Sequence, residues 1–399
     1  MAVNERLLRV LTCMMFLMFA MTSDAVGSVI PKVIDEFHLS LKAGGTFHYA
    51  PMTAIAIGAI LLGFLADSFG RKRTIILGLL LYGCSSLLFA VGQSFYFFVA
   101  LLSLAGLGIS IFKIGALALV GDISHSPRQH TATMNLIEGF FGVGSIAGPA
   151  IVAVLLTYGL SWKWLYVVAA GICFLLTLVA VSVRYPATTH PPDEAVNLAR
   201  TVRMMRDPCA LGFSLLIMLY VAVEVAIYVW MPTFLLGYRG AHAWLATYAL
   251  TIFFVLRAGG RFLGIWLLEQ FHWSAVLALL SFAILACFAG TMWAGVDAGV
   301  LLLPCSGLFM SMMYPTLNSK GISCFPRFHH GAVAGVILFF TAAAAAAGPL
   351  AMAAVSDAYG GAQYGFALAT GFAALLFAGL VYNWLAKPAE RRLELAANT

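Results

Sequence analysis

Charged residues are scarce in this sequence: Asp, Glu, Lys and Arg make up only 10% of its 399 residues, against about 25% in soluble domains. This scarcity excludes an ordinary soluble globular protein. Hydrophobic residues account for 62% of the chain, and its mean hydropathy is +0.97. A bundle of membrane-spanning helices fits this composition, because a helix satisfies its own backbone hydrogen bonds in lipid.

The sequence also lacks the patterns of disulfide, nucleotide-binding and metal chemistry. Its seven cysteines are odd in number and lie nearly all inside apolar runs, so neither a disulfide framework nor a metal site is expected. No segment resembles a P-loop or a nucleophile triad, which leaves ATP-driven transport and hydrolysis without support. The alternating ten-residue segments of β-barrels are absent. We therefore expect no enzyme, cofactor, metal or nucleic-acid partner.

Apolar runs long enough to cross a bilayer recur along the whole chain. We count twelve: 8–30, 45–66, 74–92, 95–119, 131–156, 163–183, 209–236, 243–268, 274–293, 298–320, 331–355 and 362–386. The first is too long for the apolar region of a signal peptide, so it is expected to be retained. The sequence predicts an all-α integral membrane protein with twelve transmembrane helices.

The basic residues lie on one side of this twelve-helix arrangement, which explains the net charge of +6. They are Arg6, Arg9, Arg71, Lys72, Arg73, Arg128, Arg184, Arg200, Arg203, Arg206, Arg327, Lys387, Arg391 and Arg392. By the positive-inside rule that side is cytoplasmic. We expect a multi-pass protein of the inner membrane with both termini in the cytoplasm.

Two halves are separated by the longest polar segment. The expected organisation is a six-helix bundle over 1–184, a cytoplasmic linker over 185–208 and a second six-helix bundle over 209–399. Segments 140–149 and 339–349 both begin with Phe-Phe and end with Gly-Pro, at a spacing of about 200 residues. This repeat indicates two pseudo-symmetric halves.

The loop between the second and third runs reads GFLADSFGRKR, from Gly63 to Arg73. Its glycines allow close helix approach, Asp67 suits an arginine or a helix N-terminus, and the basic cluster anchors the loop in the cytoplasm. The segment closely resembles the signature loop of the major facilitator superfamily. The resemblance implies the fold of that family and a gating role, not a substrate-binding one. The residues concerned are Gly63, Asp67, Gly70, Arg71 and Arg73, with Asp122 as a partner.

Glu224 is the only charged residue between Cys209 and Leu236. A carboxylate at that depth costs several kcal/mol unless it is protonated, paired or facing water. Tyr220 and Tyr228 lie four residues on either side and share its helix face. This pattern predicts a hydrogen-bonding stripe that lines a polar cavity within the membrane.

Segments 220–230 (YVAVEVAIYVW), 309–316 (FMSMMYPT) and 135–138 (NLIE) resemble the fucose:proton symporter family, and most of all its glucose/galactose branch. The resemblance implies sugar uptake driven by a proton or sodium gradient. Carboxylates accept hydrogen bonds from sugar hydroxyls, and tyrosines both give and accept them. The substrate-binding residues expected are Glu224, Tyr220, Tyr228, Asn135, Asn318 and Trp230.

Two positions depart from the family pattern. Lys113 follows Gly106-Leu-Gly, where fucose permeases carry an acid, and Asp24 stands about one turn from the expected first-helix acid. Lys113 requires a carboxylate, which Glu138 or Asp24 is expected to supply. A salt bridge broken by protonation would couple proton and substrate, and a permanent structural pair is the alternative. Asp24 and Glu138 are the expected proton carriers, tuned by Lys113.

Three alternatives to a proton-coupled hexose symporter remain open. Residues 144–149 (GSIAGP) match a fifth-helix motif of proton-coupled drug exporters, although close packing of small residues also explains them. Arg257, deep in the eighth run, suits an organic anion because a guanidinium binds carboxylates bidentately. A membrane sensor without transport is opposed by the intact gating loop.

Overall fold

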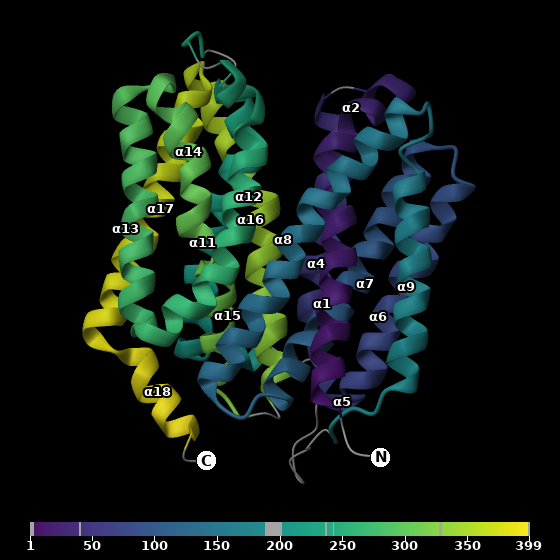
Figure 1. Cartoon of the computed structure of the whole chain (residues 1–399), viewed down its shortest axis with the longest axis vertical. Helices are drawn as coiled ribbons and strands as arrows, with labels where there is room; N and C mark the ends of the chain where they lie inside the picture. Colours follow the sequence, from purple (N-terminus) through teal and green to yellow (C-terminus); the bar gives the residue numbers. More distant parts are fainter. Residues whose placement is uncertain are drawn as a thin grey trace.

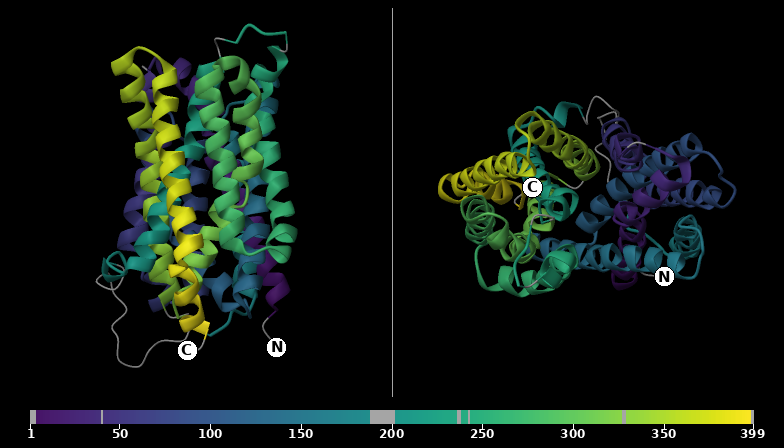
Figure 2. Two further views of the ribbon diagram at one scale, coloured as in Figure 1. Left: turned by 90° about the vertical axis from the view of Figure 1, so that its left-hand side faces the viewer. Right: turned by 90° about the horizontal axis from the view of Figure 1, so that it is seen from above.

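The computed structural model describes residues 4–39, 41–187, 202–235, 238–241, 243–326 and 329–397. Over these ranges the secondary structure is helical and contains no strand. The helices run roughly parallel to the longest axis and form two groups that lie side by side (Figure 1). Seen from above, each group is a separate cluster of helices around its own centre (Figure 2).

The first half comprises the helices that precede the polar linker. They are α1 (Glu5–Ser23), α2 (Val26–Phe37), α3 (Leu41–Gly44), α4 (Thr46–Leu61), α5 (Leu65–Ser68), α6 (Arg71–Leu87), η1 (Leu88–Ala90), α7 (Phe95–Asp122), α8 (Pro127–Thr157) and α9 (Trp164–Ser182). Side-chain caps begin three long helices of this half: Asn4 accepts from Leu7 N–H, Ser94 from Phe97 N–H, and Ser126 from Gln129 N–H.

The second half follows the linker, of which residues 188–201 lie outside the described part of the chain. Its helices are α11 (Pro208–Leu235), α12 (Ala243–Gln270), α13 (Trp273–Ala294), α14 (Val296–Met310), α15 (Met313–Ser323), α16 (His330–Tyr359), α17 (Ala362–Ala386) and α18 (Pro388–Ala397). The start of α1 and the whole of α18 lie at the same end of the molecule (Figure 1). We call this end the terminal end.

Hydropathy confirms the predicted class of fold. Within the described ranges, 11 helical stretches are long and apolar enough to cross a membrane. The second expected span, 45–66, is a shorter apolar helix, Thr46–Leu61, followed by the one-turn α5. With this helix included, the arrangement is the expected twelve-helix bundle.

Two expected spans are interrupted near their middle. The run 8–30 divides into α1 and α2 at Asp24 and Ala25, and the run 298–320 divides into α14 and α15 at Ser311 and Met312. An interrupted helix frees backbone carbonyls that need new partners within the membrane. Both interruptions border the central cavity described below, where transporters commonly use discontinuous helices.

The internal repeat has a packing role in both halves. α8 lies along α1, and α16 lies along α11, so the fifth long helix contacts the first in each half. A Cβ atom at Gly148 would lie 2.0 Å from the carbonyl oxygen of Met21, so only glycine permits this approach. A Cβ atom built at Gly348 would lie 3.4 Å from the Cα of Ala222, an ordinary van der Waals contact, so the strict need for glycine is confined to the first half. Close packing therefore accounts for Gly148 without an exporter motif.

Candidate functional site

A cavity of about 120 Å³ lies between the two halves. Its lining comes from α1, α4, α7 and α8 of the first half and from α11, α12, α15 and α16 of the second, with Asp24 at the α1–α2 break. The ionisable side chains in this lining are Asp24, Lys113, Glu138, Glu224, Tyr228, Arg257, Arg261 and Tyr314. Such a concentration of charge in an apolar bundle makes this cavity the candidate functional site.

Glu224 is paired with an arginine on the neighbouring helix. Arg257 Nε lies 2.7 Å from Glu224 Oε1, and both side chains are buried. Tyr220 donates its hydroxyl hydrogen bond to the same carboxylate. The Tyr220 hydroxyl also lies 3.0 Å from the carbonyl oxygen of Met310, at the end of α14. The expected polar stripe exists, and its Tyr220 end fastens α11 to the broken helix.

Arg261, one turn beyond Arg257, joins the two halves. Its Nε donates to the carbonyl oxygen of Ser311 at 3.2 Å, which satisfies a group freed by the α14–α15 break. Its NH1 donates to the carbonyl oxygen of Glu138 at 2.6 Å, and its NH2 lies 3.5 Å from Glu138 Oε2. Glu138 is thus held by a cation of the opposite half.

Asp24 stands at the C-terminal end of α1, where the helix breaks. Its two carboxylate oxygens accept hydrogen bonds from Ser145, on α8, and from Ser23 at 3.1 Å. No basic side chain of the described chain lies within ion-pair distance of Asp24. Among the cavity carboxylates of the described residues, it is therefore the one whose direct side-chain partners are hydroxyl groups and not a basic side chain.

Lys113 forms a different contact from the salt bridge expected. Its Nζ lies 4.8 Å from the ring centroid of Phe141 and 5.5 Å from that of Phe16, both cation–π distances. No carboxylate in the described ranges lies within 4.0 Å of it. The expectation of a partner was wrong for a simple reason: Arg261 engages Glu138, and hydroxyls engage Asp24.

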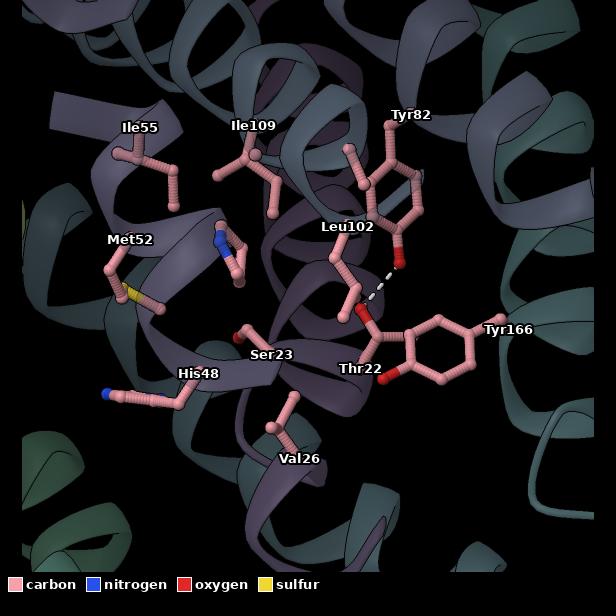
Figure 3. A pocket seen from close by; sticks show the side chains of 13 residues that line it. Thr22, Ser23, Val26, His48, Met52, Ile55, Tyr82, Leu102, Ile109 and Tyr166 are labelled. Carbon is pink, nitrogen blue, oxygen red and sulfur yellow. Dashed lines mark hydrogen bonds between the residues drawn. The ribbon is translucent and has the colours of Figure 1, made fainter. Parts of the chain in front are cut away.

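A smaller cavity, of about 30 Å³, lies within the first half beside the α1–α2 break. Its lining includes Thr22, Ser23 and His48, with the hydroxyl of Thr22 bonded to that of Tyr82 (Figure 3). The buried hydroxyl of Tyr166 has no hydrogen-bond partner among the described residues. Ser23 also lines the central cavity, so the two spaces are neighbours.

Four of the expected substrate-binding residues lie outside the cavity lining: Tyr220, Asn135, Asn318 and Trp230. Trp230 donates to the carbonyl oxygen of Pro349 at 3.3 Å and so fastens α11 to α16. Asn135 and Asn318 are fully buried, and the side-chain amide of Asn318 finds no partner within the described chain. Of the six expected, Glu224 and Tyr228 border the cavity.

The signature loop joins the halves at the terminal end. Arg71 NH1 lies 2.6 Å from Asp67 Oδ1, and Arg71 Nε lies 2.8 Å from Asp122 Oδ2. The Asp67 carboxylate also accepts from the N–H groups of Gly331 and Ala332, at 3.1 and 3.0 Å. Asp67 therefore caps the N-terminus of α16, where a negative charge is favourable.

The other residues of the loop have distinct environments. Gly70 precedes α6 with a φ of 83°, in the left-handed region that glycine adopts at no steric cost. Gly63 is buried against Gly335 of α16. A Cβ atom built at Gly335 would lie 2.9 Å from the Cα of Gly63, so the two backbones approach too closely for a side chain at Gly335. Arg73 is exposed. Burial raises the pKa of Asp67, while Arg71 and the two backbone N–H groups act to lower it.

Further contacts between the halves lie on the terminal side of the cavity. Thr131 and Ser319 share a hydrogen bond of 3.0 Å, and His130 Nδ1 lies 2.9 Å from Ser323 Oγ. Arg128 donates to the carbonyl oxygen of Glu269 at 2.8 Å. Together with the Asp67 cap, these contacts close the terminal end.

The sequence contained signals for only part of this site. Arg261 lies near the end of the eighth apolar run, a position typical of a structural arginine, yet it is only 1% exposed and contacts Glu138, which makes it part of the cavity. Ser145 and Thr341 carry no distinguishing signal, because single hydroxyls are ordinary in membrane helices. Tyr314 lies in segment 309–316, and the sequence alone assigned it no role of its own.

The family model for the Major Facilitator Superfamily matches residues 12–349, well over half of the sequence. The chain belongs to that superfamily. Its helical fold, signature loop and central cavity agree with this membership.

Relatives within the superfamily differ in function. The gentisate transporter of Corynebacterium glutamicum is 24% identical over 299 residues, which cover 73% of this chain and 63% of the relative. The chain spans about a third of the uncharacterized transporter YfiU of Bacillus subtilis, at 26% identity over 44% of this chain. The curated relatives it matches are thus covered only in part.

Solved structures share the fold at low sequence identity. The fucose transporter FucP in its outward conformation is 21% identical with a TM-score of 0.79, covering 94% of this chain and 98% of FucP. The human organic anion transporter MFSD10 is 19% identical with a TM-score of 0.72, covering 95% of this chain and all of that chain, 100%. At these identities the likeness establishes the fold alone.

Proposed function

We propose that the major facilitator protein is a proton-coupled symporter that imports a small hydroxylated solute of the sugar class by alternating access. Asp24 is the coupling carboxylate, in preference to Glu138. The observation that carries this proposal is the environment of Asp24, which lines the cavity, accepts hydrogen bonds from the hydroxyls of Ser23 and Ser145, and forms no ion pair within the described residues.

The three cavity acids differ in how easily each takes up a proton. Glu138 and Glu224 lie beside Arg261 and Arg257, which stabilise their charged forms. Protonating either would leave an arginine uncompensated inside the bundle, which costs several kcal/mol. Protonating Asp24 breaks no direct ion pair, and the hydroxyls of Ser23 and Ser145 can accept a hydrogen bond from the neutral carboxyl group, so this step costs less.

Alternating access follows from the closure of one end. The Asp67 cap on α16 and the Thr131–Ser319 contact join the halves at the terminal end. The positive-inside rule makes that end cytoplasmic, with both termini inside and the inner membrane as the location. The conformation described is then outward-facing, and transport requires these contacts to separate.

Substrate hydroxyls have partners on both sides of the cavity. Glu224, Tyr228 and Tyr314 present acceptors and donors from the second half. Asn135 and Asn318 lie buried between the halves on the closed side, so they join the site when the terminal end opens. Lys113 and Glu138 adjust the charge around Asp24.

The test is uptake of labelled sugars and sugar derivatives into proteoliposomes under an imposed pH gradient, in the wild type and in Asp24→Asn. The wild type should accumulate its substrate, whereas Asp24→Asn should lose gradient-driven accumulation and keep exchange of substrate between the two sides. The matched control is Asp35→Asn, because Asp35 is an exposed acid of α2 outside the cavity.

Two outcomes would contradict the proposal. Undiminished accumulation in Asp24→Asn would remove Asp24 from the coupling step. Absence of gradient-driven uptake for every compound tested, with apolar compounds expelled instead, would favour an exporter.

A further inference from the structure

The cavity holds three acidic and three basic side chains, and two pairs account for four of them. Glu224 lies against Arg257 and Glu138 against Arg261. The two that remain are Asp24 and Lys113, which line the same cavity without forming an ion pair with each other. With all six groups ionised, the cavity is electrically balanced.

Protonation of Asp24 changes this balance. The carboxyl group becomes neutral, and the positive charge of Lys113 then has no compensating charge in the cavity lining. The Phe141 and Phe16 rings, 4.8 and 5.5 Å from Nζ, hold the ammonium at the cavity wall. Aromatic faces stabilise a cation less than a carboxylate partner does within a membrane.

We propose that the transported solute is a monoanionic hydroxycarboxylic acid of the sugar-acid class, whose carboxylate binds Lys113 when Asp24 is protonated. The inference rests on the proposed proton symport and names its substrate. The carboxylate restores the neutrality that the proton removed. The hydroxyl groups of the solute face Glu224, Tyr228 and the guanidinium groups of the second half.

This arrangement gives the coupling a thermodynamic source. The proton on Asp24 favours the anion by leaving Lys113 uncompensated, and by linkage the anion favours the proton to the same extent. A neutral sugar would leave the charge of Lys113 uncompensated in the loaded state, so it would bind the protonated cavity without this gain. The loaded carrier therefore crosses with the same cavity charge as the empty one.

Several other titratable or charged groups face Asp24 and Lys113 across the cavity, and the mechanism must operate in their presence. They are Glu138 on α8, Glu224 and Tyr228 on α11, Arg257 and Arg261 on α12, and Tyr314 on α15, with His48, Tyr82 and Tyr166 around the smaller cavity. The two ion pairs keep their charge through the cycle. The change in net charge therefore belongs to Asp24 alone.

Electrical measurements separate an acid from a neutral sugar. One proton with one monoanion moves no net charge, whereas one proton with a neutral sugar moves one positive charge. Proteoliposomes with an alkaline interior should take up D-glucuronate, and an inside-negative potential set with valinomycin and potassium should leave the initial rate unchanged. D-glucose uptake should be at least tenfold slower under the same gradient.

If D-glucose is taken up, D-glucuronate is not, and the inside-negative potential accelerates the uptake, the substrate is not a sugar acid. Proton symport would remain supported by that result. Failure of the pH gradient to drive either compound would overturn both proposals. The two failures are therefore distinguishable in one set of vesicles.

Variants test the role of Lys113 directly. Lys113→Gln should weaken D-glucuronate binding at least tenfold at acidic pH, and Lys113→Arg should restore part of that affinity. The matched control is Lys163→Gln, because Lys163 Nζ also lies 5.0 Å from a phenylalanine ring, that of Phe98, but pairs with Glu36 outside the cavity. Wild-type affinity in a folded Lys113→Gln protein would overturn the proposal.

The pH dependence of binding provides a second readout. Wild-type affinity for D-glucuronate should rise as the pH falls and Asp24 takes up its proton. Asp24→Asn mimics the protonated side chain, so its affinity should be high and nearly independent of pH. An unchanged pH dependence in Asp24→Asn would contradict the link between the two residues.

Discussion

Glu224 and Arg257, which the sequence analysis treated as separate sites, form one ion pair. As an isolated carboxylate in an apolar helix, Glu224 predicted a polar cavity, and Arg257 was considered separately as an anion site. The two side chains lie 2.7 Å apart, and Tyr220 donates to the same carboxylate. Each side chain supplies the counter-charge that the other needs, so neither charge could be buried at this cost without its partner.

The first prediction concerns this pair. Glu224→Gln leaves the Arg257 guanidinium buried without a counter-charge, so the free energy of unfolding should fall by about 3–5 kcal/mol. Equilibrium unfolding in mixed detergent micelles measures the change. The double variant Glu224→Gln/Arg257→Gln should lose less than the sum of the two single changes, because contacting residues are coupled.

The matched control is the exposed ion pair between Arg392 and Asp207, whose atoms lie 3.2 Å apart. Arg392→Gln should change the free energy of unfolding by no more than about 1 kcal/mol, as surface pairs do. A Glu224→Gln effect as small as that of Arg392→Gln would show that water compensates Arg257.

At the scale of elements, the broken helices decide the shape of the site. The α14–α15 break exposes the carbonyls of Met310 and Ser311 to Tyr220 and Arg261, and the α1–α2 break sets Asp24 at a helix end. Hydropathy averaged over a span resolves neither break, because Glu5–Ile30 and Val296–Ser323 each qualify as one apolar stretch despite the polar residues Thr22 to Asp24 at the first break. Spans were thus predictable from the sequence, and their interruptions were not.

The second prediction concerns the junction of α5 and α16. Asp67→Asn removes the charge that caps the α16 N-terminus and pairs with Arg71. A hydrogen bond to a charged group contributes about 1.5–3 kcal/mol, so the ratio of closed to open molecules at the terminal end should fall by about tenfold or more. Spin labels at the exposed positions Arg73 and Arg391 report the separation of the halves.

Ser68→Ala is the control for that experiment, because Ser68 lies in the same one-turn helix and makes only a weak 3.4 Å bond to Leu65. Its distance distribution should match that of the wild type. If Asp67→Asn also matched the wild type, the cap would not hold the terminal end closed.

For the whole molecule, the sequence predicted most of the fold and less of the site. Apolar runs, the Gly-Pro repeat and the signature loop can be recognised from local sequence. The membrane-length helices confirm the apolar runs, and the family match agrees with the signature loop. Which cation meets which acid depends on how the halves pack. Lys113 and Arg261 both neighbour Glu138 in the cavity, and only the tertiary structure assigns it to Arg261.

The proposed coupling of proton and solute involves the whole molecule, because both must reach the same cavity from each side of the membrane in turn. If a proton travels with the solute, adding substrate outside the vesicles removes protons from the external medium even without an imposed gradient. An exporter of the antiport type would instead release protons when its substrate entered.

The most direct measurement is therefore the pH of a weakly buffered proteoliposome suspension after addition of D-glucuronate, with Asp24→Asn vesicles as the blank. The account predicts a transient alkalinisation of the medium with one proton for each molecule taken up, absent from the Asp24→Asn vesicles. Acidification, or uptake without any change in external pH, would contradict proton symport.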